Sequence, residues 1–283
     1  MRKIHMRGRG PHLPPLDQIV QYDFEPGYVV FTMPCPKRIR VQVGGVVVAD
    51  SINVILLYES DHLPVYYFPL GDIRADLLAD SATTSACPFK GLASYRSFES
   101  EGRRVDDLVW RYAQPLPQCP DVSGYASFIW NKVERWFEED EEIFVHARDP
   151  FRRVDCLPSS RRVRIEFEGV LLAESWRSVF LFETGLPTRY YLPLEDVRRA
   201  YLAQSLFETR CPYKGVARYY DLAVGETRLA DKVWYYAEPV HEAARVKGLL
   251  AFPNEFVDTF VDGVLQARPI TTFSHGYAQI DPR

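Results

Sequence analysis

The chain contains the same sequence pattern twice, at a constant spacing of 124 residues. A Cys-Pro-aromatic-Lys-Gly segment at residues 87–91 returns at residues 211–215. Two further patterns recur at the same spacing: Tyr-Tyr-x-Pro-Leu at residues 66–70 and 190–194, and Asp-x-x-Trp-x-Tyr at residues 107–112 and 231–236. A pattern repeated in this way indicates a tandem duplication, in which two copies share one fold.

The length and composition fit two globular domains. The chain has 283 residues, of which 47% are hydrophobic and 25% charged, as in ordinary soluble proteins. A net charge of -4 gives no general attraction to nucleic acid or anionic lipid, so we predict neither as a partner. No run of about 18 apolar residues and no secretory signal occur, which favours a cytoplasmic protein without membrane association.

The cysteines give no support for a disulfide framework or a metal site. The five cysteines are an odd number and form no Cys-x-x-Cys pair: Cys35, Cys87, Cys119, Cys156 and Cys211. We therefore expect reduced thiols, no structural metal and no cofactor.

The composition along the chain suggests five segments. Proline, glycine and arginine are frequent in an N-terminal arm at residues 1–37, whose later part is apolar enough to pack on a domain. The first domain is predicted at residues 38–147 and the second at residues 162–274. A linker at residues 148–161 and a C-terminal tail at residues 275–283 complete the chain.

Strand signals dominate each copy. Residues 38–43 alternate in polarity, a Gly44-Gly45 turn follows, and residues 46–49 return as a hairpin. Further strands rich in β-branched and aromatic residues are expected at residues 53–59, 65–68, 180–183 and 189–192. Short helices are expected at residues 72–78, 131–139 and 196–202, the first and last capped by aspartate. The sequence thus predicts a mainly β domain, a small curled sheet or open barrel, used twice.

The Cys-Pro-aromatic-Lys-Gly turn is the first candidate for chemistry. Its proline and glycine favour an unusual backbone that presents a thiol and an amine. The lysine is a possible anchor for an anion or a proton donor, and the cysteine a possible nucleophile or, alternatively, a small buried hydrophobe. The catalytic candidates are Cys87, Lys90, Cys211 and Lys214.

The aromatic residues shared by both copies are candidates for a binding pocket or, alternatively, for the core. In each Tyr-Tyr pair one ring faces the core and the other the opposite side of the strand. In the Asp-x-x-Trp-x-Tyr pattern the Trp and Tyr share a face if the segment is extended, whereas the Asp and Trp share one if it is a helical turn. Glu59 recurs as Glu183, and Arg74 recurs as Arg198. These charged residues could form ion pairs with other side chains or line a pocket. The candidate ligand-binding residues are Tyr66, Tyr67, Lys90, Gly91, Tyr95, Asp107 and Trp110 in the first copy, and Tyr190, Tyr191, Lys214, Gly215, Tyr219, Asp231 and Trp234 in the second.

Several motifs of known enzymes are absent from the sequence. It has no Gly-rich phosphate loop, no His-Glu-x-x-His and no Gly-x-Ser-x-Gly. The histidines do not repeat, since His62 and His146 align with Leu186 and Ile270. A histidine-dependent mechanism common to both copies is therefore excluded.

These motifs together resemble the domain of unknown function 427 family, found in bacteria and fungi and also labelled nucleotidyltransferase-like. The resemblance includes the three repeated patterns and Gly-x-x-x-Ala-x-Ser at residues 45–51 and 169–175, and it covers nearly everything after residue 37. It implies a small mainly β fold similar to the tent-like domains of the Mss4 type, and it implies no established reaction. Ala86 and Arg210 stand where the family often has histidine before the cysteine, which argues against His-assisted thiol chemistry.

Three hypotheses for the function follow. The first is that each domain binds a small, anionic molecule in an aromatic-lined pocket at the Cys-Pro-aromatic-Lys-Gly turn. The second is an enzyme that uses the cysteine or lysine of the turn, either a transferase such as a nucleotidyltransferase or a thiol-dependent catalyst. The third is a structural or interaction module without a ligand. The oligomeric state stays open.

Overall fold

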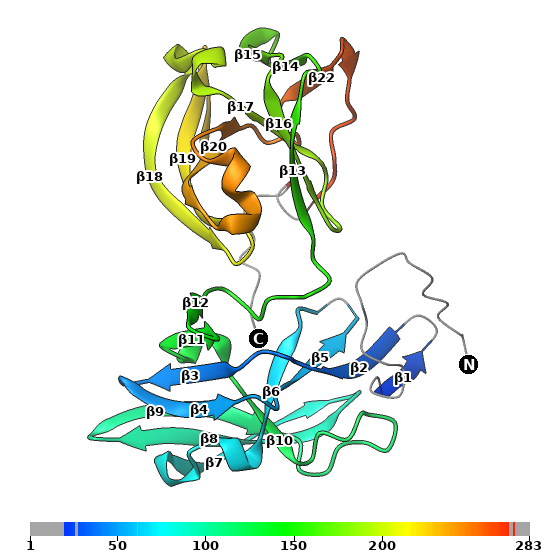
Figure 1. Cartoon of the computed structure of the whole chain (residues 1–283), viewed down its shortest axis with the longest axis vertical. Helices are drawn as coiled ribbons and strands as arrows, with labels where there is room; N and C mark the ends of the chain where they lie inside the picture. Colours follow the sequence, from blue (N-terminus) through cyan, green and yellow to red (C-terminus); the bar gives the residue numbers. More distant parts are fainter. Residues whose placement is uncertain (1–19, 26–27, 61, 272–273, 275–283) are drawn as a thin grey trace. The chain divides into compact units, whose positions relative to one another are not determined.

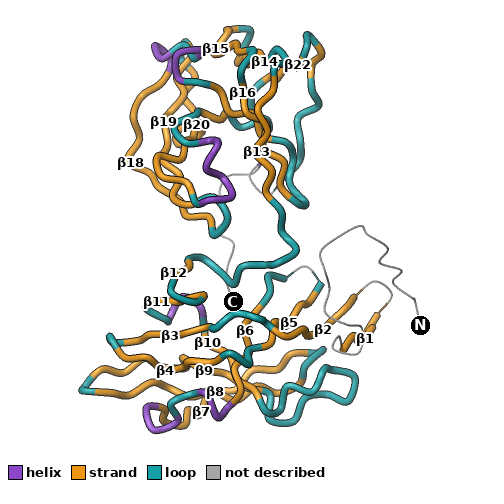
Figure 2. The backbone as a smooth tube through the Cα atoms, viewed as in Figure 1, coloured by secondary structure: helices purple, strands orange, loops and turns teal. Residues whose placement is uncertain are grey.

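The structure, a computed structural model, describes residues 20–25, 28–60, 62–271 and 274 (Figure 1). The chain divides between Asp149 and Pro150 into two compact units, and both consist mainly of strands and loops with a few short helices (Figure 2). Residues 1–19 of the predicted arm and the predicted tail at residues 275–283 lie outside the described residues. In the described part of the chain, no helical segment has the length and hydrophobicity needed to cross a bilayer.

The first domain consists of two antiparallel sheets. The larger sheet has the order β1 (Val20–Glu25), β2 (Tyr28–Pro34), β5 (Ile55–Glu59), β6 (Val65–Pro69), β10 (Tyr125–Phe128), β9 (Arg103–Arg111), β8 (Gly91–Ser100) and β7 (Leu78–Cys87). The smaller has the order β12 (Glu141–Ile143), β11 (Arg135–Glu138), β3 (Ile39–Val43) and β4 (Val46–Ser51). The predicted hairpin at residues 38–49 is confirmed as β3 and β4.

The second domain repeats this arrangement. Its larger sheet has the order β13 (Val154–Ser159), β16 (Ser178–Glu183), β17 (Arg189–Leu192), β21 (Leu250–Ala251), β20 (Thr227–Pro239), β19 (Gly215–Val224) and β18 (Leu202–Cys211). Its smaller sheet has the order β15 (Val170–Ser175), β14 (Val163–Phe167), β22 (Asp258–Val261) and β23 (Val264–Leu265). The mainly β prediction and its use in two similar domains are confirmed.

Strands occur where the sequence suggested an arm and a linker: β1 and β2 lie in the predicted arm, and β13 lies in the predicted linker. Val30 of β2 lies opposite Glu59, and Val154 of β13 lies opposite Glu183, so both pairs keep the spacing of 124 residues. Residues 28–34 and 154–159 are therefore equivalent strands of the two larger sheets. Pro158 within β13 made this segment look like a linker, but proline is tolerated in the outermost strand of a sheet.

The helix predictions were wrong in detail. The segments after Pro69 and Pro193 form pairs of three-residue 3₁₀ helices that lead directly into β7 and β18: η2 (Leu70–Asp72), η3 (Ala75–Leu77), η5 (Leu194–Asp196) and η6 (Arg199–Tyr201). Asp72 does not cap a helix but accepts a hydrogen bond from the Ser51 hydroxyl at 2.5 Å. Residues 131–139 contain the end of η4 (Trp130–Lys132), a short loop and strand β11, and not one continuous helix. The Trp136 side chain is buried in the core, and the residue lies opposite Val41 in the sheet. This pairing outweighs the helix preference of residues 131–139.

The core lies between the two sheets of each domain. In the second domain, side chains of the smaller sheet such as Ile165 and Val261 pack with Phe180, Leu192 and Leu222 of the larger sheet. A separate buried cluster covers the other face of the larger sheet, beneath the 3₁₀ helix η7 (His241–Val246). The larger sheet is therefore buried on both faces.

Candidate functional site

The retained aromatic residues gather on the face of the larger sheet that points away from the smaller sheet. In the first domain Tyr67 and Tyr112 are buried there, with Trp110 partly buried beside them. The rings of Tyr67 and Trp110 meet edge to face, with centroids 6.3 Å apart. Trp110 and Tyr112 share one face, as predicted for an extended segment, because β9 runs up to Arg111.

The two members of each Tyr-Tyr pair lie on opposite faces, as expected for a strand. Tyr67 and Tyr191 join the retained aromatic cluster. Tyr66 instead packs against Trp136 and donates a hydrogen bond to Glu138 of the smaller sheet at 2.5 Å. Tyr190 packs edge to face on Phe180 in the core between the sheets. Tyr67 shares its cluster with Cys87 and Phe89 of the turn, and Tyr191 lies close enough to Cys211 of the second turn for that thiol to affect its pKa.

In the second domain the same cluster has a defined hydrogen bond. The indole nitrogen Nε1 of Trp234 donates to the hydroxyl of Tyr191 at 2.9 Å. Burial is the main cause that raises the pKa of Tyr191, so the hydroxyl stays protonated and neutral. Tyr219 and Tyr236 lie in the same cluster, and Tyr219 shares a hydrogen bond with Thr209, as Tyr95 does with Ser85.

The Trp234 hydrogen bond leads to a prediction for Tyr191. The Tyr191→Phe variant removes the acceptor and leaves the indole N–H without its partner, so the free energy of unfolding should fall by about 1–3 kcal/mol. Urea denaturation of the full chain measures this loss. Tyr190→Phe is the matched control in the adjacent position, and we expect a change below about 0.5 kcal/mol. Equal losses in the two variants would contradict the assigned role of the hydrogen bond.

Each turn lysine is held in a buried ion pair. Lys90 pairs with Glu59 of β5, and Lys214 pairs with Glu183 of β16. The lysine side chains are 11% and 13% exposed, and those of the glutamates 9% and 4%. The repeated glutamates thus form ion pairs, one of the two possibilities that the sequence left open, and the sequence did not identify their partner. Arg74 pairs instead with its neighbour Asp76 at the surface.

An arginine adds positive charge to the site in the second domain. The guanidinium of Arg152 lies 3.3 Å from the Glu183 carboxylate and 5.6 Å from the centre of the Tyr213 ring. Lys214, Arg152 and Glu183 therefore bring two positive charges and one negative charge together. Arg152 could not be predicted from the repeat, since the equivalent position 28 of the first copy is a tyrosine.

The backbone conformation explains why both turns end in glycine. Gly91 and Gly215 have φ values of 106° and 101°, a region that residues with side chains rarely adopt. A Cβ atom on Gly91 would lie 3.3 Å from the carbonyl oxygen of Gln114, and one on Gly215 would lie 3.1 Å from that of Glu238. Their retention in both copies therefore follows from chain geometry.

The repeated aspartates also have a structural role. Asp107 and Asp231 have positive φ values of 51° and 56°. Their carboxylates accept hydrogen bonds from Ser81 of β7 and Ser205 of β18, each in the irregular part of the edge strand that lies two places along the sheet. The interpretation of Asp107 and Trp110 on one helical turn was wrong, because this segment is a strand. Ser81 and Ser205 were missed, although their repetition at the spacing of 124 residues was visible.

The thiols near the turn differ in burial. Cys87 and Cys211 are partly buried. Cys119 is buried, and burial is the largest cause that raises its pKa to about 11, while Lys90 acts in the opposite direction. Burial likewise raises the pKa of Cys156, opposed by Lys214. Cys119 and Cys156 are therefore protonated at neutral pH and poor nucleophiles.

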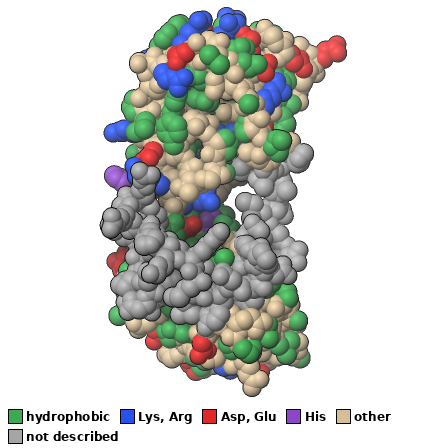
Figure 3. All heavy atoms as spheres, turned by 90° about the vertical axis from the view of Figure 1, so that its right-hand side faces the viewer, with side chains coloured by type: hydrophobic (Ala, Val, Ile, Leu, Met, Phe, Trp, Pro, Cys, Tyr) green, Lys and Arg blue, Asp and Glu red, His purple; other side chains and the backbone are tan. Residues whose placement is uncertain are grey.

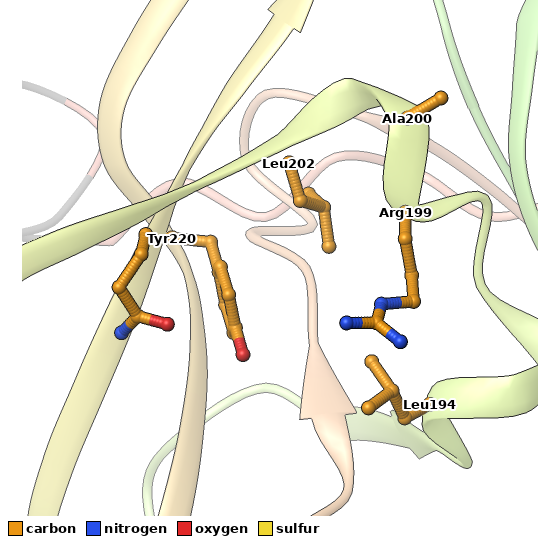
Figure 4. A pocket seen from close by; sticks show the side chains of 6 residues that line it. Leu194, Arg199, Ala200, Leu202 and Tyr220 are labelled. Atoms are coloured by element: carbon orange, nitrogen blue, oxygen red, sulfur yellow. The ribbon is translucent and has the colours of Figure 1, made fainter.

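Two surface hollows lie away from these turns. One, in the second domain, has a volume of about 530 Å³ and is lined by residues of η5, η6, β18 and β19 (Figure 4). The other, in the first domain, has a volume of about 400 Å³ and includes Asp50, Asp72 and Arg74.

Charged side chains of both signs are mixed over the upper part of the space-filling view (Figure 3). Within the described residues, no group of three or more His, Cys, Asp or Glu side chains is arranged to hold a metal ion.

The fold and the repeated site define a tandem protein of two similar β domains, each with a buried lysine–glutamate pair beside an aromatic cluster. A comparison with protein-family models matches the domain of unknown function DUF427 at residues 32–139 and again at residues 155–263. The chain therefore belongs to the DUF427 family and contains two copies of its domain. A search of curated proteins found no match.

Proposed function

We propose that each domain binds a small molecule over the sheet face that contains the lysine–glutamate pair and the retained tryptophan, and that the second domain binds an anion. The observation that carries the proposal is the same buried ion pair in both domains. Removing two charges from water costs several kcal/mol, which the pair itself seldom recovers, so apolar residues of similar volume would often stabilise the fold as well or better. A costly pair that is kept twice therefore favours a role in binding.

The chemistry of the pair suits a polar ligand. A lysine ammonium has three hydrogen-bond donors and a carboxylate several acceptor positions, so each group has capacity beyond the ion pair. Glu59 lies close enough to Tyr67 and Tyr112 to contribute to their raised pKa values, after the larger effect of burial. The pair and the aromatic cluster are thus neighbours, and together they offer both charge and ring surface.

The anionic preference rests on the second domain. Lys214 and Arg152 both contact Glu183, so one of the two positive charges has no carboxylate of its own in this group. Arginine and lysine are the usual partners of carboxylates and phosphates. Nucleotides, sugar phosphates and organic acids are therefore the compounds to test first.

Thermal unfolding of the full chain with these compounds tests the proposal. A ligand at about 100 times its dissociation constant should add about 2.7 kcal/mol to the stability of the native state. Because a single lysine substitution would leave a buried carboxylate, the test variant is Lys214→Met with Glu183→Gln, matched by Lys90→Met with Glu59→Gln. We expect an anion to stabilise the wild type and the first-domain variant but not the second-domain variant.

Other outcomes favour the other functions. If no compound stabilises the wild type at millimolar concentration, the proposal fails and the interaction module is favoured. If Cys211→Ser removes the effect, a thiol-dependent enzyme becomes the better explanation, since the binding proposal assigns no role to this partly buried thiol. Equal stabilisation of all variants would place binding elsewhere on the chain.

A further inference from the structure

The larger hollow lies between η6, the start of β18 and the middle of β19 in the second domain (Figure 4). Its volume of about 530 Å³ falls within the range of about 300–1,000 Å³ for small-molecule sites. Leu194 and Leu202 provide apolar surface, and Arg199, Gln204 and Tyr220 provide polar groups. It is separate from the Lys214 turn.

Arg199 is the charged group of this hollow. Within the described part of the chain its guanidinium has no ion pair and no hydrogen bond, and Figure 4 shows it extending into the hollow beside Leu194. Tyr220 lines the opposite side, and its ring packs on Tyr235 with centroids 5.4 Å apart. Gln204 lies directly opposite Tyr220 across the two strands. A cation, a fixed aromatic ring and an amide therefore surround one space.

The first domain lacks this combination at the equivalent positions. Ala75 corresponds to Arg199, Asp80 to Gln204 and Arg96 to Tyr220. In the first domain Arg96 is bound by its own chain, since Nε lies 2.8 Å from the Asp80 carboxylate and Nη2 donates to the Leu78 carbonyl at 2.8 Å. The second domain has no such pair at Gln204 and Tyr220, and its arginine lies at a different position, Arg199.

We propose that this hollow binds a small carboxylate with a flat aromatic body. The guanidinium of Arg199 pairs with the carboxylate, for which its planar set of donors is well suited. The ring of Tyr220 and the two leucines pack on the aromatic body, and the Gln204 amide hydrogen-bonds its polar edge. The proposal does not depend on the function proposed for the Lys214 site.

Calorimetric titration of the full chain with 2-naphthoate, and with neutral 2-naphthamide, tests this site. Arg199→Ala introduces the residue that the first domain has at this position. We expect Arg199→Ala to weaken 2-naphthoate binding at least tenfold. Binding of 2-naphthamide should be unchanged, because the neutral amide forms no ion pair with the guanidinium. The Lys214→Met, Glu183→Gln variant, which lacks the other proposed anion site, should still bind 2-naphthoate. Adding Arg199→Ala to this variant should weaken the remaining binding at least tenfold, which separates the two sites.

A second variant distinguishes the loss of a binding residue from misfolding of the protein. The triple variant Arg199→Ala, Gln204→Asp, Tyr220→Arg copies the first-domain residues, whose internal ion pair is compatible with this fold. It should unfold like the wild type and bind neither probe. The proposal is overturned if the wild type does not bind 2-naphthoate at millimolar concentration, or if wild type and Arg199→Ala bind it equally well.

Discussion

Replacing Glu59 with leucine should lower the free energy of unfolding of the first domain by about 3–5 kcal/mol. Glu59 is the ion-pair partner of Lys90, whose side chain is 11% exposed, so the substitution leaves a buried ammonium without its counter-charge. Urea titration followed by hydrogen–deuterium exchange measures the loss, because exchange reports the two domains separately. The second domain should be unchanged and serves as the internal reference.

The double variant Lys90→Met, Glu59→Leu separates lost charge from lost packing. It removes both charges and keeps apolar volume, and such replacements of buried ion pairs are often neutral or stabilising. We therefore expect it to be more stable than Glu59→Leu alone and close to the wild type. If the single and double variants lose equal stability, the ion pair is not the cause, and the packing of the Glu59 side chain must be.

The second large effect is expected for Gly215→Ala. The alanine would have to keep a φ of 101° and place its Cβ 3.1 Å from the backbone oxygen of Glu238. Strained backbone conformations cost about 1–3 kcal/mol each, and the contact with a backbone atom cannot be relieved by a side-chain movement. We expect a loss at the upper end of this range, measured by the same urea titration.

Gly169→Ala is the matched control. Gly169 also has a positive φ, 76°, but nothing lies within 4 Å of its added Cβ. This variant therefore has the backbone strain without the close contact, and its loss should be smaller than that of Gly215→Ala. If the two losses are equal, the close approach to Glu238 does not explain why both copies retain glycine at the end of the turn.

The sequence was sufficient for the fold class because the repeat provided an internal comparison. The Gly44-Gly45 hairpin and the strands at residues 55–59 and 65–69 follow local rules of alternation and turn chemistry. The spacing of apolar residues at 72–78 is typical of a short helix, but the buried Ile73 and Leu78 each lie directly after one of two 3₁₀ turns. At residues 131–139 the decisive contact was the sheet pairing of Trp136, which no local pattern contains.

The site was predictable in part. The repeat identified Lys90, Lys214 and the glutamates, but the partners within each ion pair depend on strand order, which brings residues 31 positions apart into contact. The repeat also identifies Asp107 and Gly91, and backbone geometry accounts for their retention in both copies. Arg199 and Tyr220 could not be found by comparing the copies, since they lie where the copies differ.

The irregular edge strands have a consequence for solubility and assembly. β7 and β18 are the outermost strands of two similar sheets in one chain, and exposed edges of this kind promote aggregation and the exchange of strands between copies. In both strands three residues, 81–83 and 205–207, lie opposite a single residue of the neighbouring strand. The serine–aspartate hydrogen bonds hold this distortion in place. Asp107 and Asp231 thus keep β7 and β18 in an irregular shape that is unsuited to pairing between these two edge strands.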